Sequence, residues 1–190
     1  MAKNTGSRLR IIGGKWRSRM LPIVDAEGLR PTTDRVRETV FNWLQPSLYG
    51  AKVLDLFAGS GVLAFEALSR EAKSAVLIEK NKQAARNLNE NAKTLGASNA
   101  QIVNTDALNW LATCDQTFNV IFLDPPFNKG LLPSCIELIN DKDLIETNGW
   151  VYIESESDLR DLPIPRHWHL HREKKAGIVV LRLFQVEEKS

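Results

Sequence analysis

The segment that most constrains this chain is KVLDLFAGSGVLA, which runs from Lys52 to Ala64. Its first half, Val53 to Leu56, predicts a short buried strand, and its glycines predict a tight turn into a helix that ends near Leu68. A strand, a glycine turn and a helix in this order are typical of α/β sheets that bind nucleotides, because the helix N-terminus attracts negative charge. The segment also fits the dinucleotide pattern G-x-G-x-x-G/A, with Glu79 near the offset of an acid that holds a ribose.

Two features argue against a dinucleotide as the ligand. Asp55 places a carboxylate at the end of the predicted strand, where it would repel a pyrophosphate. Further along the chain stands the tetrapeptide DPPF, Asp124 to Phe127, which a nicotinamide-dependent enzyme does not require. An NAD-dependent dehydrogenase is therefore the weaker interpretation. Measuring whether NAD or another cofactor raises the melting temperature of the protein would test it.

These motifs together resemble the S-adenosylmethionine-dependent methyltransferases of the Rossmann-like class. The segment from Asp55 to Gly61 is similar to the cofactor loop of that class, and DPPF is similar to the D-P-P-[YFW] signature of enzymes that methylate amino groups. Outside this core, RIIGG at residues 10–14 and RPTTDRVRE at residues 30–38 resemble the bacterial 16S ribosomal RNA guanine-N2 methyltransferases of the RsmD type. The resemblance covers nearly the whole chain.

From residue 51 onward, predicted strands and helices alternate, which indicates an α/β fold with a Rossmann-like, mostly parallel sheet flanked by helices. The resemblance implies the methyltransferase type of this sheet, whose last strand is antiparallel. Residues 1–50 are expected to form a small extension of a β-hairpin and a helix, and residues 51–190 the methyltransferase domain. The expected strands are 53–56, 75–78, 101–104, 118–123, 150–153 and 178–186, and the expected helices include 62–68, 82–95 and a segment around 132–139.

Acidic residues follow four consecutive strands of this pattern, namely Asp55, Glu79, Asp106 and Asp124. The carboxyl ends of parallel strands meet at one edge of a sheet, and ligands of open α/β sheets bind at that edge. We therefore expect the four carboxylates to converge. One acid at a strand end carries little information, but four in succession indicate a binding site.

The resemblance implies a role for each part of a cofactor site. S-adenosylmethionine has no phosphate, so its site needs acids for ribose hydroxyls and amines. Glu79 would accept hydrogen bonds from the ribose, and Asp106 from the adenine amine, although Asp106 could also cap the helix expected from residue 107. Asp55 would anchor the loop or meet the methionine amine. The backbone along the methionine portion would be that of Phe57, Ala58, Gly59 and Gly61.

The DPPF loop would carry catalysis, with Asp124, Pro125, Pro126 and Phe127 as the candidate residues. An exocyclic amine on a base is a poor nucleophile because its lone pair is delocalised into the ring. Acceptors on its two N–H groups favour the pyramidal form, and the Asp124 carboxylate and the Pro125 carbonyl would supply them. The prolines stiffen the loop, and Phe127 offers a face for an unstacked base. Direct transfer then needs neither a covalent intermediate nor a metal.

The first fifty residues are basic, with nine Lys and Arg against four Asp and Glu, whereas the whole chain has a formal net charge of +2. Residues 9–12 and 18–22 alternate like two strands of a hairpin. Trp16 lies between them and either stacks on an RNA base or packs the hairpin onto the body of the protein. The charge alone is equally compatible with a solvated surface arm.

A helix is expected to follow this hairpin, capped by Thr33 or Asp34 and ended by Pro46 and Gly50. Cations close to a helix N-terminus are unfavourable unless an anion binds there. The arginines around this helix start therefore favour a site for RNA phosphate or for the cofactor's carboxylate. The candidate RNA contacts of the basic front region are Arg10, Lys15, Arg17, Arg30, Arg35 and Arg37.

The remaining residues favour a cytoplasmic protein, by default a monomer. Cys114 and Cys135 are far apart and suit reduced thiols, and the sequence has neither a signal-peptide core nor an apolar run that could cross a bilayer. His167, His169 and His171 alternate as if on one face of a strand. Because no Cys or acid cluster joins them, we expect no metal.

The resemblance implies 16S ribosomal RNA as the partner, within the small ribosomal subunit or its assembly intermediate, and S-adenosylmethionine as the cofactor. An adenine-N6 methyltransferase acting on DNA is the alternative enzyme, since DPPF allows it, but such enzymes need a sizeable recognition region that this chain lacks. A non-enzymatic RNA-binding module is the alternative from another class. Such a module would bind RNA after Asp124→Ala and transfer no methyl group in either form.

Overall fold

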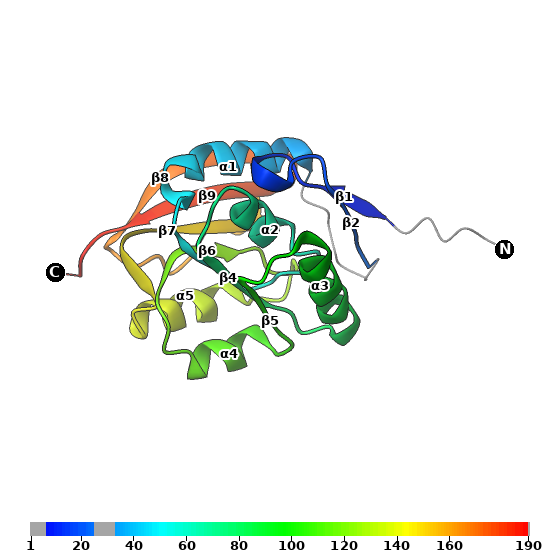
Figure 1. The fold of residues 1–190 in the computed structure, drawn as a ribbon. Helices are drawn as coiled ribbons and strands as arrows, with labels where there is room; N and C mark the ends of the chain where they lie inside the picture. The colour runs from blue at the N-terminus through cyan, green and yellow to red at the C-terminus, as the bar shows by residue number, and fades with distance from the viewer. Residues whose placement is uncertain (1–6, 25–32, 190) are drawn as a thin grey trace.

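A mixed sheet runs through the molecule in the order β5-β4-β3-β6-β7-β9-β8 (Figure 1). The computed structural model describes residues 7–24 and 33–189. Neighbours from β5 to β7 pair in parallel, whereas β9 pairs antiparallel with β7 and with β8. The predicted α/β fold, with its antiparallel last strand, is confirmed. The strands are β3 (Lys52–Asp55), β4 (Ser74–Ile78), β5 (Ala100–Val103), β6 (Phe118–Leu123), β7 (Ile145–Glu156), β8 (Trp168–Ala176) and β9 (Val179–Val186).

Helices cover both faces of this sheet (Figure 1). The helices are α1 (Asp34–Leu48), α2 (Val62–Ser69), α3 (Lys82–Leu95), α4 (Ala107–Thr113) and α5 (Leu132–Asp141). The first three share one apolar cluster with alternate residues of the strands, and α4 and α5 share a second cluster with the residues between them. Within the described part of the chain, no helix is long and apolar enough to span a membrane.

Local signals set most helix boundaries. Asn81 accepts hydrogen bonds from two backbone N–H groups at the start of α3, and Gly96 ends α3 in the left-handed region with φ of 66°. Thr33 caps α1 through the backbone N–H of Val36, at 3.3 Å. Pro46 was expected to end α1, and this expectation is wrong, because the helix continues to Leu48. Pro46 removes one hydrogen bond of the last turn, while the fully buried Leu48 keeps that turn packed on the sheet.

The N-terminal segment forms a short hairpin of β1 (Arg8–Arg10) and β2 (Met20–Pro22) around the 3₁₀ turn η1 (Gly14–Trp16). Both strands are shorter than predicted because the loop between them is tied to α2. The backbone N–H groups of Ile12 and Gly13 donate to the Glu66 carboxylate at 2.9 and 2.7 Å. The backbone N–H of Trp16 donates to Ser69 Oγ at 2.9 Å. The Trp16 side chain is buried, so the packing interpretation holds and the stacking interpretation is wrong.

The division of the chain at residue 50 stays a prediction. Helix α1 lies before that boundary but packs on the sheet that follows it, where the rings of Phe41 and Phe122 have centroids 5.9 Å apart. The hairpin, in contrast, rests on α2 and α3 at the side of the molecule (Figure 1). The extension is therefore fastened to the body by two different elements.

Candidate active site at the carboxyl edge of the sheet

The predicted convergence of acids is seen at the carboxyl ends of the parallel strands. Asp55 ends β3, where its register partners are Leu77 of β4 and Phe122 of β6. Glu79 follows β4 directly, and Asp124 follows β6 directly. The charge of Glu79 raises the pKa of Asp55, and the charge of Asp55 in turn raises the pKa of Asp124, so Asp55 lies within electrostatic reach of both acids.

Asp55 is the most constrained of these acids. Burial raises the pKa of its carboxyl group to about 7, against backbone hydrogen bonds from Ala64 and Phe57, and the charge of Glu79 raises it further. Its Oδ2 atom is buried and accepts no hydrogen bond from any described residue. A buried acceptor without a partner is costly, so a ligand that brings an amine to this atom would be stabilised.

Glu79 organises the glycine loop through its carboxylate. The backbone N–H of Gly59 donates to Glu79 Oε2 at 2.8 Å, and that of Asn81 donates to Oε1 at 2.7 Å. The N–H of Ala58 donates to the carbonyl of Ile78 in β4 at 2.9 Å. The loop is therefore held in place by the protein itself. The role of Glu79 toward a ribose stays a prediction.

Gly61 cannot be replaced without strain. Its φ is 76°, in the left-handed region that favours glycine. A Cβ atom there would lie 2.4 Å from Leu88 Cδ2 and 2.7 Å from Phe65 Cε2. The loop therefore needs glycine for its backbone conformation and for the close packing of α2 on α3.

Asp106 caps helix α4, which was one of its two predicted roles. Its Oδ1 atom accepts from the backbone N–H groups of Leu108 and Asn109, at 3.0 and 3.3 Å. Its Oδ2 atom lies 3.2 Å from Lys80 Nζ, on a lysine side chain that is 80% exposed. The contact with adenine stays a prediction, and it would require this exposed lysine to move aside.

Asp124 begins the DPPF loop beside two other carboxylates. Burial raises the pKa of Asp124 well above its ordinary value, and the charges of Glu154 and then Asp55 raise it further. Pro125 is buried, whereas Phe127 is half-buried. At the end of the loop, the backbone N–H of Asn128 donates to Glu156 Oε1. The loop is therefore fixed at both ends, with a carboxylate held at its start.

Three residues of β7 take part in this site and were missed by sequence reasoning: Tyr152, Glu154 and Glu156. The Tyr152 hydroxyl donates to Glu154 Oε2 at 3.1 Å, and Glu156 holds the DPPF loop. A usable signal was present, because the predicted strand 150–153 is followed immediately by two acids in IESES. Acids follow this fifth strand as they follow the first four.

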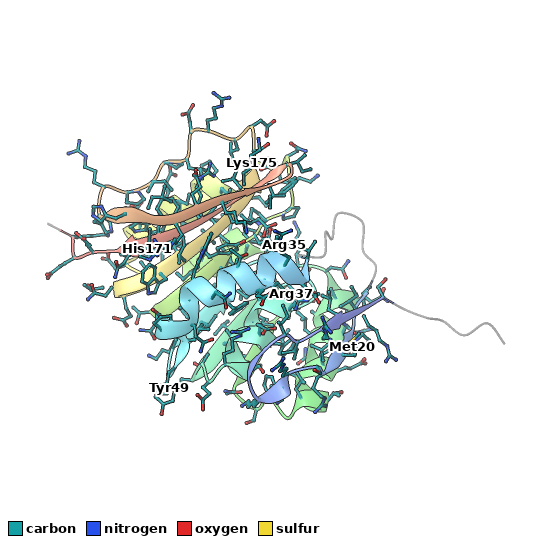
Figure 2. All side chains as sticks on the ribbon, turned by 90° about the horizontal axis from the view of Figure 1, so that it is seen from above. Met20, Arg35, Arg37, Tyr49, His171 and Lys175 are labelled. Atoms are coloured by element: carbon teal, nitrogen blue, oxygen red, sulfur yellow. The ribbon has the colours of Figure 1, made fainter. Side chains whose placement is uncertain are left out.

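A cavity of about 500 Å³ opens beside Glu154, between the start of α1 and the turn that joins β8 to β9. Its walls combine apolar side chains with cations. Figure 2 shows Arg35 at the N-terminal end of α1 and Lys175 at the end of β8. The lining residues include Val36, Leu181, Val179, Lys174, Lys175 and Arg35. This cavity is large enough for a nucleobase, and it reaches the DPPF loop through Glu154, which follows the register partner of Leu123.

The predicted RNA contacts fall into different environments. Arg35 lines the cavity, whereas Lys15 and Arg17 are exposed on the hairpin, with Lys15 Nζ 4.5 Å from the centre of the Trp16 ring. Arg10 is exposed, and its guanidinium donates to Asp34 Oδ2 at 2.9 Å. Arg30 lies outside the described residues. For the exposed residues the RNA contact stays a prediction.

Arg37 is the exception, and its predicted RNA contact is wrong. Its side chain is fully buried, donates to the carbonyl of Arg10 at 2.6 Å and pairs with Asp34. Its Nη1 atom also lies 3.8 Å from the buried carboxylate of Glu66. The sequence predicted that an anion offsets the arginines at the start of α1. For Arg37, the carboxylates of Asp34 and Glu66 are those anions.

The alternating histidines of β8 make contacts of different kinds. The register of β8 shifts at His171, where the strand has a β-bulge. The His171 ring packs edge-on against Trp150, with the ring centroids 4.9 Å apart. His169 Nε2 lies 3.2 Å from Glu187 Oε2. Residues 7–24 and 33–189 contain no group of three His, Cys, Asp or Glu that could hold a metal ion. Burial and the charge of Asp106 raise the pKa of the Cys135 thiol to about 12, so it is not a nucleophile at neutral pH.

Comparison with known proteins places this site in a family context. A sequence model of the family described as Conserved hypothetical protein 95 matches residues 9–185. A relative from Escherichia coli (strain K12) is 49% identical over 95% of this chain and 91% of its own length, and one from Haemophilus influenzae is 44% identical over 96% of each chain. Both are named ribosomal RNA small subunit methyltransferase D.

Solved structures agree with the fold. A structure from Escherichia coli superposes with a TM-score of 0.90 at 47% identity, covering 95% of this chain and 99% of the other. An RNA methyltransferase from Salinibacter ruber, solved in complex with S-adenosyl-L-homocysteine, has a TM-score of 0.63 at 18% identity, covering 85% of this chain and 96% of the other. The second match shows a shared fold alone.

Proposed function

Because this chain belongs to the family Conserved hypothetical protein 95, we propose that it transfers a methyl group from S-adenosylmethionine to the N2 amine of a guanine in 16S ribosomal RNA. The resemblance to ribosomal RNA methyltransferases of the RsmD type is confirmed by relatives at 44% and 49% identity. One observation carries the chemistry: Asp55 ends β3 and Asp124 follows the neighbouring parallel strand β6, so that the charge of Asp55 acts on Asp124.

The chain's own residues fit the proposed cofactor. The unsatisfied Oδ2 atom of Asp55 suits the methionine amine, which supplies N–H donors. Glu79, already bonded to the loop, suits the ribose hydroxyls, and Asp106 suits the adenine amine. When bound, S-adenosylmethionine supplies an electrophilic methyl group on a sulfonium cation. Carboxylates around a cation are favourable, which agrees with a site rich in acids.

Asp124 acts on the attacking amine. Its carboxylate and the Pro125 carbonyl accept the two N–H bonds of the amine, so that the nitrogen lone pair is directed away from them. Methyl transfer makes this nitrogen more acidic, and it must lose one proton. The raised pKa of Asp124 suits it to take that proton, because a carboxylate of ordinary pKa would be a weaker base.

The remaining parts of the proposal concern RNA and location. The phosphates of the substrate would be neutralised by four exposed cations, Arg10, Lys15, Arg17 and Arg35. Because the whole chain has a net charge of only +2, RNA binding depends on such a local basic surface. The substrate would be the small ribosomal subunit or its assembly intermediate, in the bacterial cytoplasm. A DNA adenine substrate is not favoured by the named relatives.

Labelling identifies the product. Purified protein and methyl-labelled S-adenosylmethionine would be offered to unmodified small subunits, free 16S RNA and plasmid DNA, followed by analysis of the labelled nucleosides. The expected product is N2-methylguanosine from the subunit or its RNA, and Asp124→Ala serves as the inactive control. Label found only as N6-methyladenine in DNA would overturn the ribosomal assignment and keep the catalytic one.

A further inference from the structure

The register of β6 and β7 places two carboxylates side by side. Leu123, the last residue of β6, pairs with Ile153, so Asp124 directly after β6 and Glu154 of β7 occupy the next positions along two parallel backbones, which lie about 4.8 Å apart in a sheet. Side chains alternate along a strand, so both carboxylates share the sheet face on which Phe122 packs against α1. The charge of Glu154 acts directly on Asp124, which agrees with this placement.

Glu154 is buried, and the protein holds one of its two carboxylate oxygens. Its side chain belongs to a residue that is 8% exposed. Oε2 accepts the hydrogen bond from the Tyr152 hydroxyl at 3.1 Å. No described residue donates to Oε1, and this oxygen is not one of the buried side-chain atoms left without a partner, so solvent reaches it. The residue therefore has one oxygen fixed by the protein and one available to a ligand.

The available side of Glu154 faces the cavity between α1 and the β8–β9 turn. Glu154 is the acid among the cavity's lining residues, whereas the outer wall carries Arg35, Lys174 and Lys175. A volume of about 500 Å³ with apolar walls, one deep acceptor and cations outside suits a base attached to a phosphate backbone. The base would then enter with its hydrogen-bonding edge toward β6 and β7.

We propose that Glu154 selects guanine by accepting its N1–H, while the neighbouring Asp124 accepts an N–H of the reacting N2 amine. This inference rests on the proposed function and adds the residue that recognises the base. Guanine carries N1–H and the N2 amine next to each other on its Watson–Crick edge, so two adjacent donors meet two adjacent carboxylates. Each donor favours the ionised form of its acceptor, which offsets the cost of placing two acids side by side.

Adenine fails at the same position for a simple reason. Its amine also has a ring nitrogen as neighbour, but that N1 carries a lone pair in place of a hydrogen. An ionised Glu154 would face this lone pair without a hydrogen bond, and sites built to bond a donor reject analogues that lack it by factors of about 10⁴. Glu154 thus distinguishes the proposed reaction from the adenine-N6 reaction that DPPF also allows.

The test replaces the target guanine in 16S RNA by 2-aminopurine, at the position that labelling identifies. This analogue keeps the reacting amine and lacks N1–H. Wild-type protein is expected to lose at least about 100-fold in kcat/KM for methyl transfer. RNA with 6-thioguanine at the same position controls for the exocyclic oxygen, because it changes that atom and keeps N1–H, and it should remain a good substrate.

Glu154→Gln sharpens the test, because an amide can accept from N1–H or donate to a bare N1. Its kcat/KM on guanine is expected to fall roughly 10- to 100-fold, while the guanine to 2-aminopurine ratio falls toward one. Glu146→Gln removes an exposed carboxylate from the same strand and should leave the ratio unchanged. Cofactor affinity measured by calorimetry reports whether the Gln variant is folded.

The outcomes separate the inference from the function on which it rests. Equal transfer to guanine and 2-aminopurine by wild-type protein, which needs no variant, would overturn the role of Glu154 and leave the proposed function standing. An unchanged ratio in a folded Glu154→Gln variant would do the same. Absence of any methylated guanine in ribosomal RNA would instead overturn the proposed function first.

Discussion

The two halves of the sheet edge treat their acids differently. On the side of β4 and β5, Glu79 and Asp106 each accept two backbone N–H groups, so the protein satisfies them. On the side of β6 and β7, burial raises the pKa of both Asp124 and Glu154, and the charge of Glu154 raises the pKa of Asp124 further. Asp55 lies between the two halves with one unsatisfied oxygen.

This difference indicates a division of labour. The half assigned to the cofactor is organised before any ligand arrives, because its carboxylates hold the glycine loop and cap α4. In the half assigned to the substrate, carboxylates are close together and partly removed from water, which is unfavourable. A base that donates N–H groups to them would reduce this cost. Hydrogen bonds from the base to these carboxylates position the reacting amine. They accelerate transfer to the extent that they are stronger in the transition state than in the ground state.

The largest effect is expected from Asp124→Ala, which removes the central acceptor of the substrate half. Methyl transfer should fall by about 10³-fold or more, because the amine loses the group that orients its lone pair. Cofactor affinity, measured by calorimetry, should change little, since the other half is untouched. Asp158→Ala, at an exposed acid beyond β7, is the matched control. Turnover near that of wild type would break the distinction between the two halves.

A second prediction concerns Asp55→Asn and the pH dependence of stability without ligand. The pKa of Asp55 is raised from 3.8 to about 7, so the folded protein holds this proton where the unfolded chain has lost it. The stability that it contributes is complete below about pH 4 and is lost as pH rises to about 7. The Asn side chain stays neutral, so the variant does not lose this stability. Its free energy of unfolding relative to that of wild type should therefore rise by up to about 4 kcal/mol between pH 4 and pH 7.

Denaturant titrations at pH 5 and pH 8 measure this difference. The gain at pH 8 should exceed the gain at pH 5, and the same variant should bind S-adenosylmethionine more weakly because the amine loses a charged partner. Asp115→Asn, at an exposed acid far from the sheet edge, provides the control. If the free energies of unfolding of wild type and Asp55→Asn changed equally between pH 5 and pH 8, burial would not raise the pKa of this carboxyl group.

How much of this site the sequence predicts depends on whether the signal is local or tertiary. The bounds of α3 were predicted correctly because Asn81 and Gly96 act on their own neighbours. The convergence of Asp55 and Asp124 followed from the geometry of parallel strands. Arg37 was misassigned because its burial depends on tertiary contacts with the Arg10 carbonyl and the Glu66 carboxylate, which no local pattern links to it. Glu154 was missed although an acid directly after a predicted strand was a usable signal, whereas its pairing with Asp124 depends on the register between β6 and β7, which the sequence does not give.

A smaller effect is expected from Gly61→Ala in the cofactor half. A Cβ atom would meet Leu88 Cδ2 at 2.4 Å, in a backbone conformation that already disfavours alanine. The free energy of unfolding should fall by about 2–4 kcal/mol, from the sum of backbone strain and overpacking. Gly96→Ala has a similar φ of 66° with open space around it, so it should cost only about 1 kcal/mol. Equal losses in the two variants would mean that the packing of α2 on α3 adds nothing.

The smallest effect should come from Arg35→Ala, at the outer wall of the cavity in the substrate half. Arg35 forms no ion pair with the described residues, so its removal should leave the melting temperature unchanged. One phosphate contact fewer should weaken RNA binding by a few-fold and reduce the slope of log Kd against log salt by about one. Lys73→Ala removes an exposed cation at the opposite edge of the sheet, before β4, and should change neither quantity. If both variants lowered the slope equally, RNA would be held by diffuse charge, and the cations beside Glu154 would have no special part in presenting the base.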